Sequence, residues 1–270
     1  MTATHSGTDS ASSSAHTKAS HAARPTGPQW WREAALDALA LALPTRCAGC
    51  EADDRLVCPA CRSLLVPQVR AIELWREGHV ALPLYFGLNY EPPVSGLLHA
   101  LKESGATAVT PPLAAALRQI IAEVLPQLTK PAPTKAPRSA PVWVAPPSTT
   151  ASYRARGYVP VALLARRAGV RLQPLLRQAR ARRDQSELGR TERFDNMAGT
   201  MIATPAARGA SVILLDDVAT SGATLFEAAR ALRAGGATVL AAITLAHTPA
   251  HINLSGHSQS QNVDKPTRED

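Results

Sequence analysis

The stretch VILLDDVATSGAT, residues 212–224, constrains the fold of this chain more strongly than any other. Its four leading apolar residues predict a strand that is buried on both faces of a sheet. Asp216 and Asp217 follow directly, and a buried strand cannot carry two carboxylates without partners for them. Both acids should therefore face a cleft at the carboxyl end of the strand, the edge at which open α/β sheets bind ligands.

Strands and helices alternate along most of the chain. The apolar patterns predict strands around a turn at 81–90, helices at 95–105 and 112–127, a strand at 142–145, a helix at 158–168, strands at 170–174 and 211–216, a helix at 223–236 and a strand at 238–246. Strands separated by helices of this length form βαβ units. We therefore expect an α/β fold with an open parallel sheet and helices on both faces.

Composition sets the expected domain boundaries. Residues 1–28 and 251–270 are polar and have no apolar run, which predicts disordered tails. Residues 126–141 are rich in proline and predict a linker or exposed loop. Between the tails we expect a helix plus a cysteine module at 29–66 and an α/β domain at 80–250.

No segment of the sequence predicts export or a membrane span. Residues 1–28 lack the apolar core of a secretory signal, and the apolar run at 39–43 is too short to cross a bilayer. The pattern WWREAALDALALAL at 30–43 predicts an amphipathic helix, which could pack on the domain or contact a membrane surface. We expect a cytoplasmic protein.

The four cysteines form a single cluster with the spacing C-x2-C-x7-C-x2-C, and they are Cys47, Cys50, Cys58 and Cys61. Two such pairs bring four thiolates around one tetrahedral ion, Zn²⁺ above all, and leave no position for a water. Disulfides are rare in the cytoplasm, whereas unligated thiols and an iron–sulfur cluster stay as alternatives. The spacing therefore predicts a structural zinc site.

Positive charge is concentrated in one segment. The whole chain has a formal net charge of +8, and residues 154–193 contain eleven arginines against three acids, also a net excess of +8. A solvated helical face is one interpretation of this segment. The other is a surface that binds phosphates or nucleic acid.

The chemistry of the opening stretch points to a sugar phosphate. Carboxylates such as Asp216 and Asp217 accept hydrogen bonds from vicinal hydroxyls, as on a ribose, and hold Mg²⁺ through its waters. The residues that follow offer backbone N–H groups and hydroxyls at the start of a helix: Thr220, Ser221, Gly222, Ala223 and Thr224. Such a loop is an anion cradle. Together these groups predict a site for a 5-phosphorylated ribose.

The same thirteen residues resemble the phosphoribosyl pyrophosphate (PRPP) signature of the type I phosphoribosyltransferases. The resemblance implies the open parallel sheet of that class, with Asp216 and Asp217 on the ribose hydroxyls and Mg²⁺, and residues 220–224 on the 5-phosphate. Members that act on purines often carry a carboxylate where this chain has Thr220. Salvage of free purines is therefore disfavoured, because proton transfer to the base lacks its usual carrier.

A zinc ribbon before such a domain resembles the ComF family, known for its role in competence for DNA uptake. The resemblance runs from about Leu36 to Pro249 and includes the segments LLHALKESG at 97–105 and YRARG at 153–157. It also includes the pattern Gln185, Leu188, Arg193 and Asn196.

This resemblance implies roles for residues outside the signature. Lys102, Arg156 and Gly157 would lie on the pyrophosphate side, where an always-charged, fork-shaped guanidinium suits the ligand. A flexible hood over the site would contain Gln185, Arg193 and Asn196.

Two departures from the family pattern fall on the pyrophosphate side. Val159 and Pro160 stand where Asn-Gln is usual, and Ala151 and Ser152 occupy places that are often basic. The ribose-phosphate half of the site is thus more complete than the pyrophosphate half. PRPP binding is better supported than turnover, and the sequence assigns no catalytic residue.

Three functions are consistent with these features. The first is a ComF-type, PRPP-binding competence protein that assists uptake or processing of single-stranded DNA, with partners such as a ComF-operon helicase. The second is an active phosphoribosyltransferase with an unidentified acceptor, and the third is a PRPP-sensing regulatory module. Aromatic residues make up 4% of the chain, so any DNA contact should be mainly electrostatic.

Overall fold

The computed structural model describes residues 46–53, 55–75, 80–130, 140–148, 150–179 and 197–248. All of them belong to one compact unit, Pro44–Asp270. The predicted helix at 30–43, both predicted tails and the hood residues Gln185, Arg193 and Asn196 lie outside the described residues. The domain boundaries predicted from composition stay predictions.

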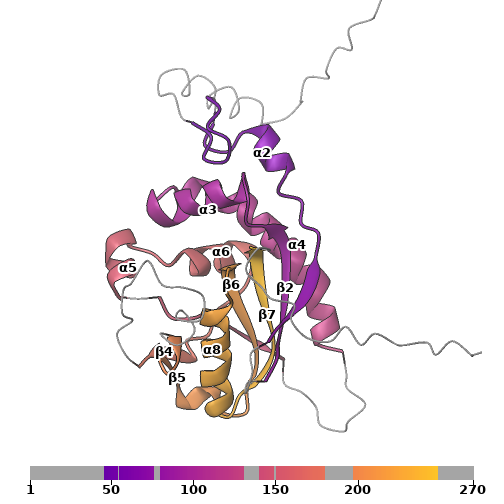
Figure 1. Ribbon diagram of the computed structural model, residues 1–270, viewed down its shortest axis with the longest axis vertical. Helices are drawn as coiled ribbons and strands as arrows, with labels where there is room; N and C mark the ends of the chain where they lie inside the picture. The colour runs from indigo at the N-terminus through magenta and orange to yellow at the C-terminus, as the bar shows by residue number, and fades with distance from the viewer. Residues whose placement is uncertain are drawn as a thin grey trace, which may run out of the picture. The chain divides into compact units, whose positions relative to one another are not determined.

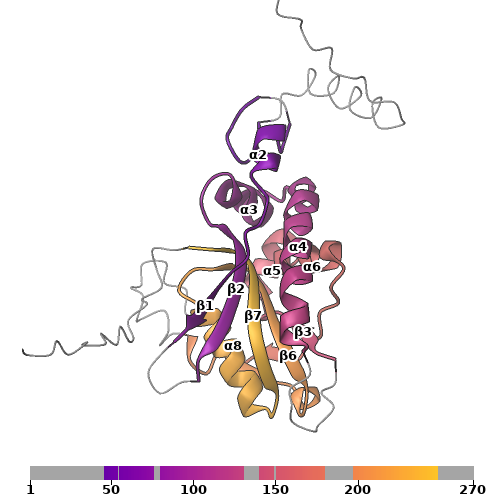
Figure 2. The same ribbon diagram turned by 90° about the vertical axis from the view of Figure 1, so that its right-hand side faces the viewer.

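The described core is a five-stranded sheet with the order β1-β2-β7-β6-β3 (Figures 1 and 2). Its strands are β1 (Arg70–Leu74), β2 (Leu82–Asn89), β3 (Val142–Val144), β6 (Ser211–Ala219) and β7 (Thr238–His247). The pairs β2–β7, β7–β6 and β6–β3 are parallel, and β1 is antiparallel to β2. The predicted α/β fold with an open parallel sheet is confirmed, with the difference that the edge strand β1 is antiparallel.

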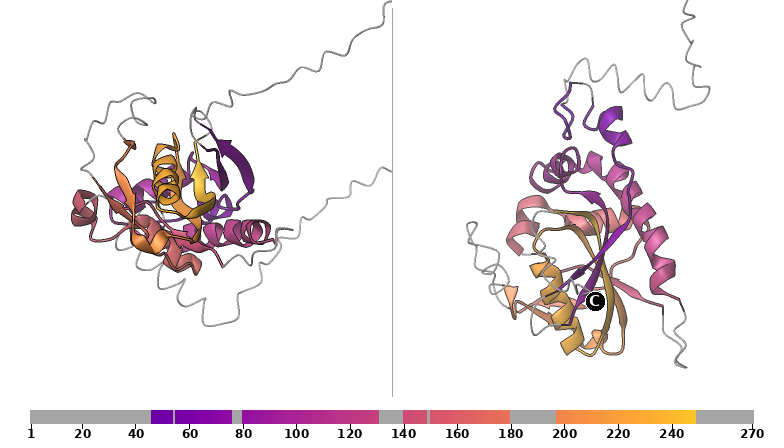
Figure 3. Two further views of the ribbon diagram at one scale, coloured as in Figure 1. Left: turned by 90° about the horizontal axis from the view of Figure 1, so that it is seen from below. Right: turned by 45° about the vertical axis from the view of Figure 1, so that its right-hand side comes forward.

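Helices cover both faces of this sheet (Figures 2 and 3). The helices are α2 (Pro59–Ser63), α3 (Val94–Glu103), η1 (Thr107–Val109), α4 (Thr110–Leu128), α5 (Thr150–Arg156), α6 (Pro160–Ala168), η2 (Pro205–Ala207) and α8 (Ala223–Ala234). One apolar cluster joins α3, α4 and α6 to the sheet, and a second joins α8 to the opposite face. A two-stranded sheet of β4 (Leu176–Gln178) and β5 (Met201–Ala203) packs against α8.

Helix α4 is the longest described helix and packs on the sheet. Residues 107–128, which include η1, are long and apolar enough to cross a membrane, with a mean hydropathy of 1.2. Half of this stretch is buried within the fold. Leu113, Leu117, Ile120 and Val124 follow the helical period and are each at most 1% exposed. We therefore assign it as a core helix of the domain.

Two strand predictions were wrong. The stretch predicted as two strands around a turn, 81–90, contains one strand, β2 (Leu82–Asn89). A Cβ on Gly87 would lie 2.6 Å from side-chain atoms of Ile120. This glycine therefore allows α4 to pack closely on the sheet, and it does not form a turn. Residues 170–174 contain only an isolated bridge between Leu172 and Trp143, and the strand comes later, as β4.

The elements that were not predicted include β1, α5 and β5. The proline-rich segment also begins later than expected, because Pro126 lies inside the last turn of α4. Strand β6 continues three residues beyond its predicted end, to Ala219. Asp216 and Asp217 are therefore residues of the strand itself, the sixth and seventh of its nine.

The cysteine module packs on the first turns of α3. Cys47, Cys58 and Cys61 belong to the same apolar cluster as Leu97 and Leu98 of α3. A Cβ on Gly96 would lie 2.2 Å from the carbonyl oxygen of Ala48, so only glycine allows this approach. Through this contact the module supports the helix that carries Lys102.

Candidate functional site

The acid pair lies at the carboxyl end of β6, in the middle of the sheet. Asp216 pairs with Thr244 of β7, and the strands stay in register as far as Ala219 and His247. Asp217 is only 6% exposed, and its Oδ1 accepts a hydrogen bond from Lys102 Nζ at 2.7 Å. The fold thus joins two predicted site residues that are 115 positions apart in the chain.

The pKa values of Lys102 and Asp216 are both shifted in this group. Burial lowers the pKa of Lys102, but Asp217 outweighs burial and raises that pKa above its ordinary value. Burial and the neighbouring Asp217 charge raise the pKa of Asp216 to about 7, although Lys102 and the backbone N–H of Asp217 oppose the shift. That N–H donates to Asp216 Oδ1 at 2.9 Å. Asp216 can therefore gain or lose a proton near neutral pH.

The raised pKa makes a prediction about stability. Native Asp216 keeps its proton between pH 3.8 and about 7, where the unfolded chain has lost it, so its stabilising contribution is lost as the pH rises through 7. We expect Asp216→Asn, which cannot ionise, to raise the free energy of unfolding by roughly 1–4 kcal/mol at pH 8 and by less at pH 5. Urea unfolding at both pH values measures the gain. The matched change Glu123→Gln on the exposed side of α4 should show none, and an equal gain at both pH values contradicts the prediction.

The loop after β6 has the geometry of a phosphate cradle. Gly222 has a φ of +76° and immediately precedes α8, and Ser221 Oγ accepts a hydrogen bond from the Ala223 N–H at 3.4 Å. A Cβ on Gly222 would also lie 3.0 Å from the end of the Leu74 side chain of β1, so any other residue here would displace that side chain. Thr220 is exposed and Thr224 is half-buried. Backbone N–H groups and hydroxyls at the start of a helix suit a phosphate oxygen.

The predicted pyrophosphate-side residues meet at the last turn of α3. Arg156 Nη2 donates to Glu103 Oε1 at 3.0 Å, and Glu103 directly follows Lys102. The Tyr158 hydroxyl donates to the carbonyl oxygen of Leu101. Gly157 has a φ of +74°, which lets the chain turn between α5 and α6. The structure therefore places Lys102, Arg156 and Gly157 in one region.

Glu103 and Tyr158 were missed from the sequence. Each makes its contact across more than 50 positions of the chain, so no local pattern could identify its partner. Glu103 holds the side chain of Arg156, and Tyr158 ties the α5–α6 turn to α3. Both therefore fix the position of groups assigned to the pyrophosphate side.

The four cysteines are arranged to bind a metal ion. Their sulfur atoms all lie within 4.8 Å of one another, and Cys50 is the exposed member. Backbone N–H groups of Gly49 and Cys58 each approach Cys47 Sγ at 3.4 Å. Burial raises the pKa of Cys47, but backbone N–H donors outweigh burial and lower that pKa to about 6. Burial and the neighbouring thiols raise the pKa of Cys61. A thiolate at neutral pH is the form that binds metal.

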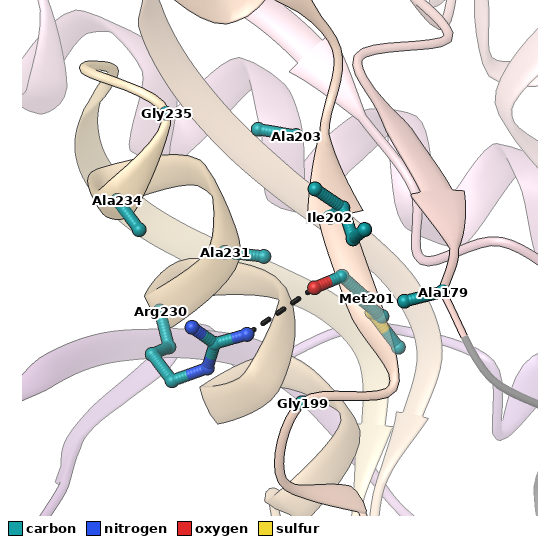
Figure 4. A pocket seen from close by; sticks show the side chains of 9 residues that line it. All are labelled: Ala179, Gly199, Met201, Ile202, Ala203, Arg230, Ala231, Ala234 and Gly235. Carbon is teal, nitrogen blue, oxygen red and sulfur yellow. Dashed lines mark hydrogen bonds between the residues drawn. The ribbon is translucent and has the colours of Figure 1, made fainter.

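A cavity of about 450 Å³ lies between β5 and the second half of α8 (Figure 4), and its lining includes neither residue of the acid pair. Its lining is mostly apolar and includes Met201, Ile202 and Ala231. Arg230, at its rim, donates to the Met201 carbonyl oxygen at 3.2 Å and forms an ion pair with buried Glu227. These contacts fasten β5 to α8, and the cavity contains none of the predicted site residues.

Comparison with known proteins agrees with this geometry. Residues 152–265 match the family described as the phosphoribosyl transferase domain. The chain carries a phosphoribosyltransferase domain. The matched region contains the acid pair, the phosphate loop, Arg156 and Gly157, and it begins after Lys102. No curated protein matches the chain.

Proposed function

We propose that this chain binds PRPP with Mg²⁺ at the carboxyl end of β6. Asp216 and Asp217 hold the ribose hydroxyls and the ion, residues 220–224 hold the 5-phosphate, and Lys102 and Arg156 bind the pyrophosphate. The observation that carries the proposal is the contact of 2.7 Å between Lys102 and Asp217, because it places the cation of α3 beside the acid pair. The match to the phosphoribosyltransferase domain supports it.

Isothermal titration with PRPP and Mg²⁺ tests this proposal directly. We expect one site per chain and weaker binding when Mg²⁺ is omitted. Absence of heat with PRPP at millimolar concentration, from a folded protein, would contradict it. Release of pyrophosphate during incubation with PRPP separates turnover from binding.

For the biological role we propose a ComF-type function in the cytoplasm, in which the PRPP site assists uptake or processing of single-stranded DNA. The support comes from exposed arginines, among them Arg154, Arg166, Arg167, Arg171 and Arg177. Partners of this role are single-stranded DNA and competence transport proteins such as a ComF-operon helicase. Gln185, Arg193 and Asn196 are proposed as the hood over the site, and Zn²⁺ as the ion of the four cysteines.

Salt dependence tests the DNA contact. Each phosphate neutralised on a single strand contributes about 0.7 to the slope of log K against log salt. We therefore expect the double variant Arg166→Ser/Arg167→Ser to reduce this slope by about 1.4 if both residues contact phosphates. An unchanged slope would show that neither arginine contacts a phosphate. Unchanged transformation frequency after deletion of the gene in a transformable host excludes the competence role.

The second candidate function is transfer of phosphoribose to an unidentified acceptor. It is favoured by the convergence of Lys102 and Arg156 at one end of α3, where they would stabilise pyrophosphate as the leaving group. Pyrophosphate release in the presence of a candidate acceptor supports it. Tight PRPP binding without release of pyrophosphate favours the competence function or a PRPP-sensing regulator.

A further inference from the structure

A polar cluster at the carboxyl end of β2 and β7 has no role in the proposed site so far. We call Arg70, Asn89 and His247 the Arg70 cluster. Arg70 Nη2 donates to Asn89 Oδ1 at 2.7 Å, and the guanidinium carbon lies 4.8 Å from the centre of the Phe86 ring. The other partner of Phe86 is His247, with the ring centres 4.6 Å apart. Two contacts from β2 thus hold the Arg70 side chain in one orientation.

Strand register places this cluster beside the phosphate loop. Asn89 pairs with His247, and His247 pairs with Ala219, the residue directly before Thr220. Residues paired in register on neighbouring strands project to the same face of a sheet. The N–H of Thr248 donates to the Ala219 carbonyl oxygen at 3.1 Å and extends the pairing to the start of the loop.

A second contact joins the loop to the strand that carries Arg70. Gly222 of the loop packs against Leu74 of β1. Arg70 and Leu74 are four residues apart on that strand and therefore share a face. Leu74 lies in the same apolar cluster as Leu225 and Phe226 of α8, so this face is the one that α8 covers (Figure 2). Arg70 thus projects on the side of the sheet where the 5-phosphate is proposed to bind.

Two buried polar atoms at this edge have no hydrogen-bond partner within the described ranges, His247 Nε2 and Thr248 Oγ1. His247 is only 4% exposed. Burial and the charge of Arg70 lower the pKa of His247, so its imidazole is neutral at pH 7 and offers one donor and one acceptor. Buried polar atoms are normally paired, so an unpaired imidazole nitrogen at the carboxyl end of the sheet calls for an explanation.

The distribution of charged side chains indicates that the ligand group at this edge is a phosphate. The loop residues 220–224 contain no charged side chain, so they offer a phosphate dianion only neutral donors. Lys102 and Arg156 are engaged at the other end of the site. The bond to Asn89 uses one of the five N–H donors of the Arg70 guanidinium, whose fork matches phosphate oxygens.

We propose that Arg70, oriented by Asn89 and Phe86, binds the 5-phosphate of the ligand, and that the neutral imidazole of His247 is a second hydrogen-bond partner at the same end. The inference rests on the proposed function, because it requires a phosphorylated ribose in the loop. It adds a charged residue from β1, which lies outside residues 152–265, to the site.

Titration of the full chain with ribose 5-phosphate and, separately, with pyrophosphate tests the inference. We expect Arg70→Gln to weaken ribose 5-phosphate about tenfold, by loss of a charge-assisted bond, and pyrophosphate less than twofold. Arg70→Lys keeps the charge without the fork and should weaken ribose 5-phosphate less than Arg70→Gln. His247→Phe keeps a ring against Phe86 and should weaken the same ligand about threefold.

The matched control is Arg208→Gln, which removes an exposed arginine just before β6, at the opposite edge of the sheet. It should leave both affinities unchanged. If the wild type binds ribose 5-phosphate and Arg70→Gln binds it equally well, the inference fails while the proposed function stands. If the wild type binds neither ligand nor PRPP, the proposed function itself fails. Equal weakening of both ligands in a folded Arg70→Gln protein also overturns the assignment.

Discussion

Cys58→Ser is expected to remove the metal from the chain and to weaken pyrophosphate binding at the far end of α3. Metal sites with four thiolates contribute roughly 10–16 kcal/mol in small zinc modules, more than the 5–15 kcal/mol that stabilises a whole domain. Loss of one ligand should therefore unfold residues 46–65. Elemental analysis should show close to one zinc per wild-type chain and almost none in the variant.

Unfolding of the cysteine module in Cys58→Ser should also affect Lys102, because the module supports α3. The module and the helix share an apolar cluster, and the last turn of α3 holds the Lys102–Asp217 ion pair. We expect faster amide exchange over residues 94–103 and a pyrophosphate affinity reduced about tenfold, whereas α8 on the opposite face keeps its protection. Unchanged exchange in α3 would show that the module and the helix fold independently.

Gly96→Ala separates metal binding by the cysteine module from the packing of that module on α3. It keeps all four thiols but places a Cβ 2.2 Å from the Ala48 carbonyl oxygen, so the module cannot dock as in the wild type. We expect normal zinc content together with faster exchange in α3. Loss of zinc in this variant would mean that docking and metal binding are one event.

The positions of the acid pair and of the loop after β6 could be predicted because their signals are local. A run of apolar residues, two acids and a small loop with a glycine stand consecutively in the chain, and each has a direct physical meaning. Gly222 has the positive φ that such a loop requires. The four-cysteine cluster was predictable for the same reason, since ligand spacing alone brings the sulfurs together.

The remainder of the site depends on contacts that sequence spacing does not encode. The resemblance drew attention to Lys102, but its partner Asp217 follows from the packing of α3 over the sheet. The same is true of Glu103 with Arg156. Strand β1 was missed because it is an edge strand with one fully buried position, Leu74, so its apolar alternation is weak.

Gly87 is a second case in which a contact distant in the chain could not be predicted from sequence spacing. A glycine among apolar residues predicts a turn when only neighbouring residues are considered. Here it lies in the middle of β2, where α4 crosses the strand so closely that any side chain would collide with Ile120. The reason for this glycine is a helix that begins more than 20 positions later in the chain.

Asp217→Asn is expected to change the two halves of the ligand site in opposite directions. The Asp217 carboxylate is proposed to accept hydrogen bonds from the ribose hydroxyls, and charge-assisted bonds contribute about 1.5–3 kcal/mol each. Ribose 5-phosphate should therefore bind roughly tenfold to a hundredfold more weakly. Pyrophosphate should bind as tightly or more tightly, because Lys102 no longer donates to a carboxylate at 2.7 Å and its charge becomes available.

Two variants test this interpretation together with titration of both ligands. Glu123→Gln removes one exposed carboxylate elsewhere and should change neither affinity. Lys102→Gln should weaken pyrophosphate about tenfold and ribose 5-phosphate little. Asp217→Asn alone leaves the partly buried ammonium of Lys102 without its partner. The double variant Lys102→Gln/Asp217→Asn removes that ammonium, so its free energy of unfolding should partly recover relative to Asp217→Asn.

The direction of the pyrophosphate change is the decisive observation. A general loss of structure in Asp217→Asn would weaken both ligands, and thermal unfolding of the variant identifies that outcome. A mere electrostatic effect of removing one negative charge would strengthen both phosphorylated ligands. Only a carboxylate that binds the ribose and also occupies Lys102 produces weaker ribose 5-phosphate with undiminished pyrophosphate binding, so either of the other two patterns removes Asp217 from the proposed site.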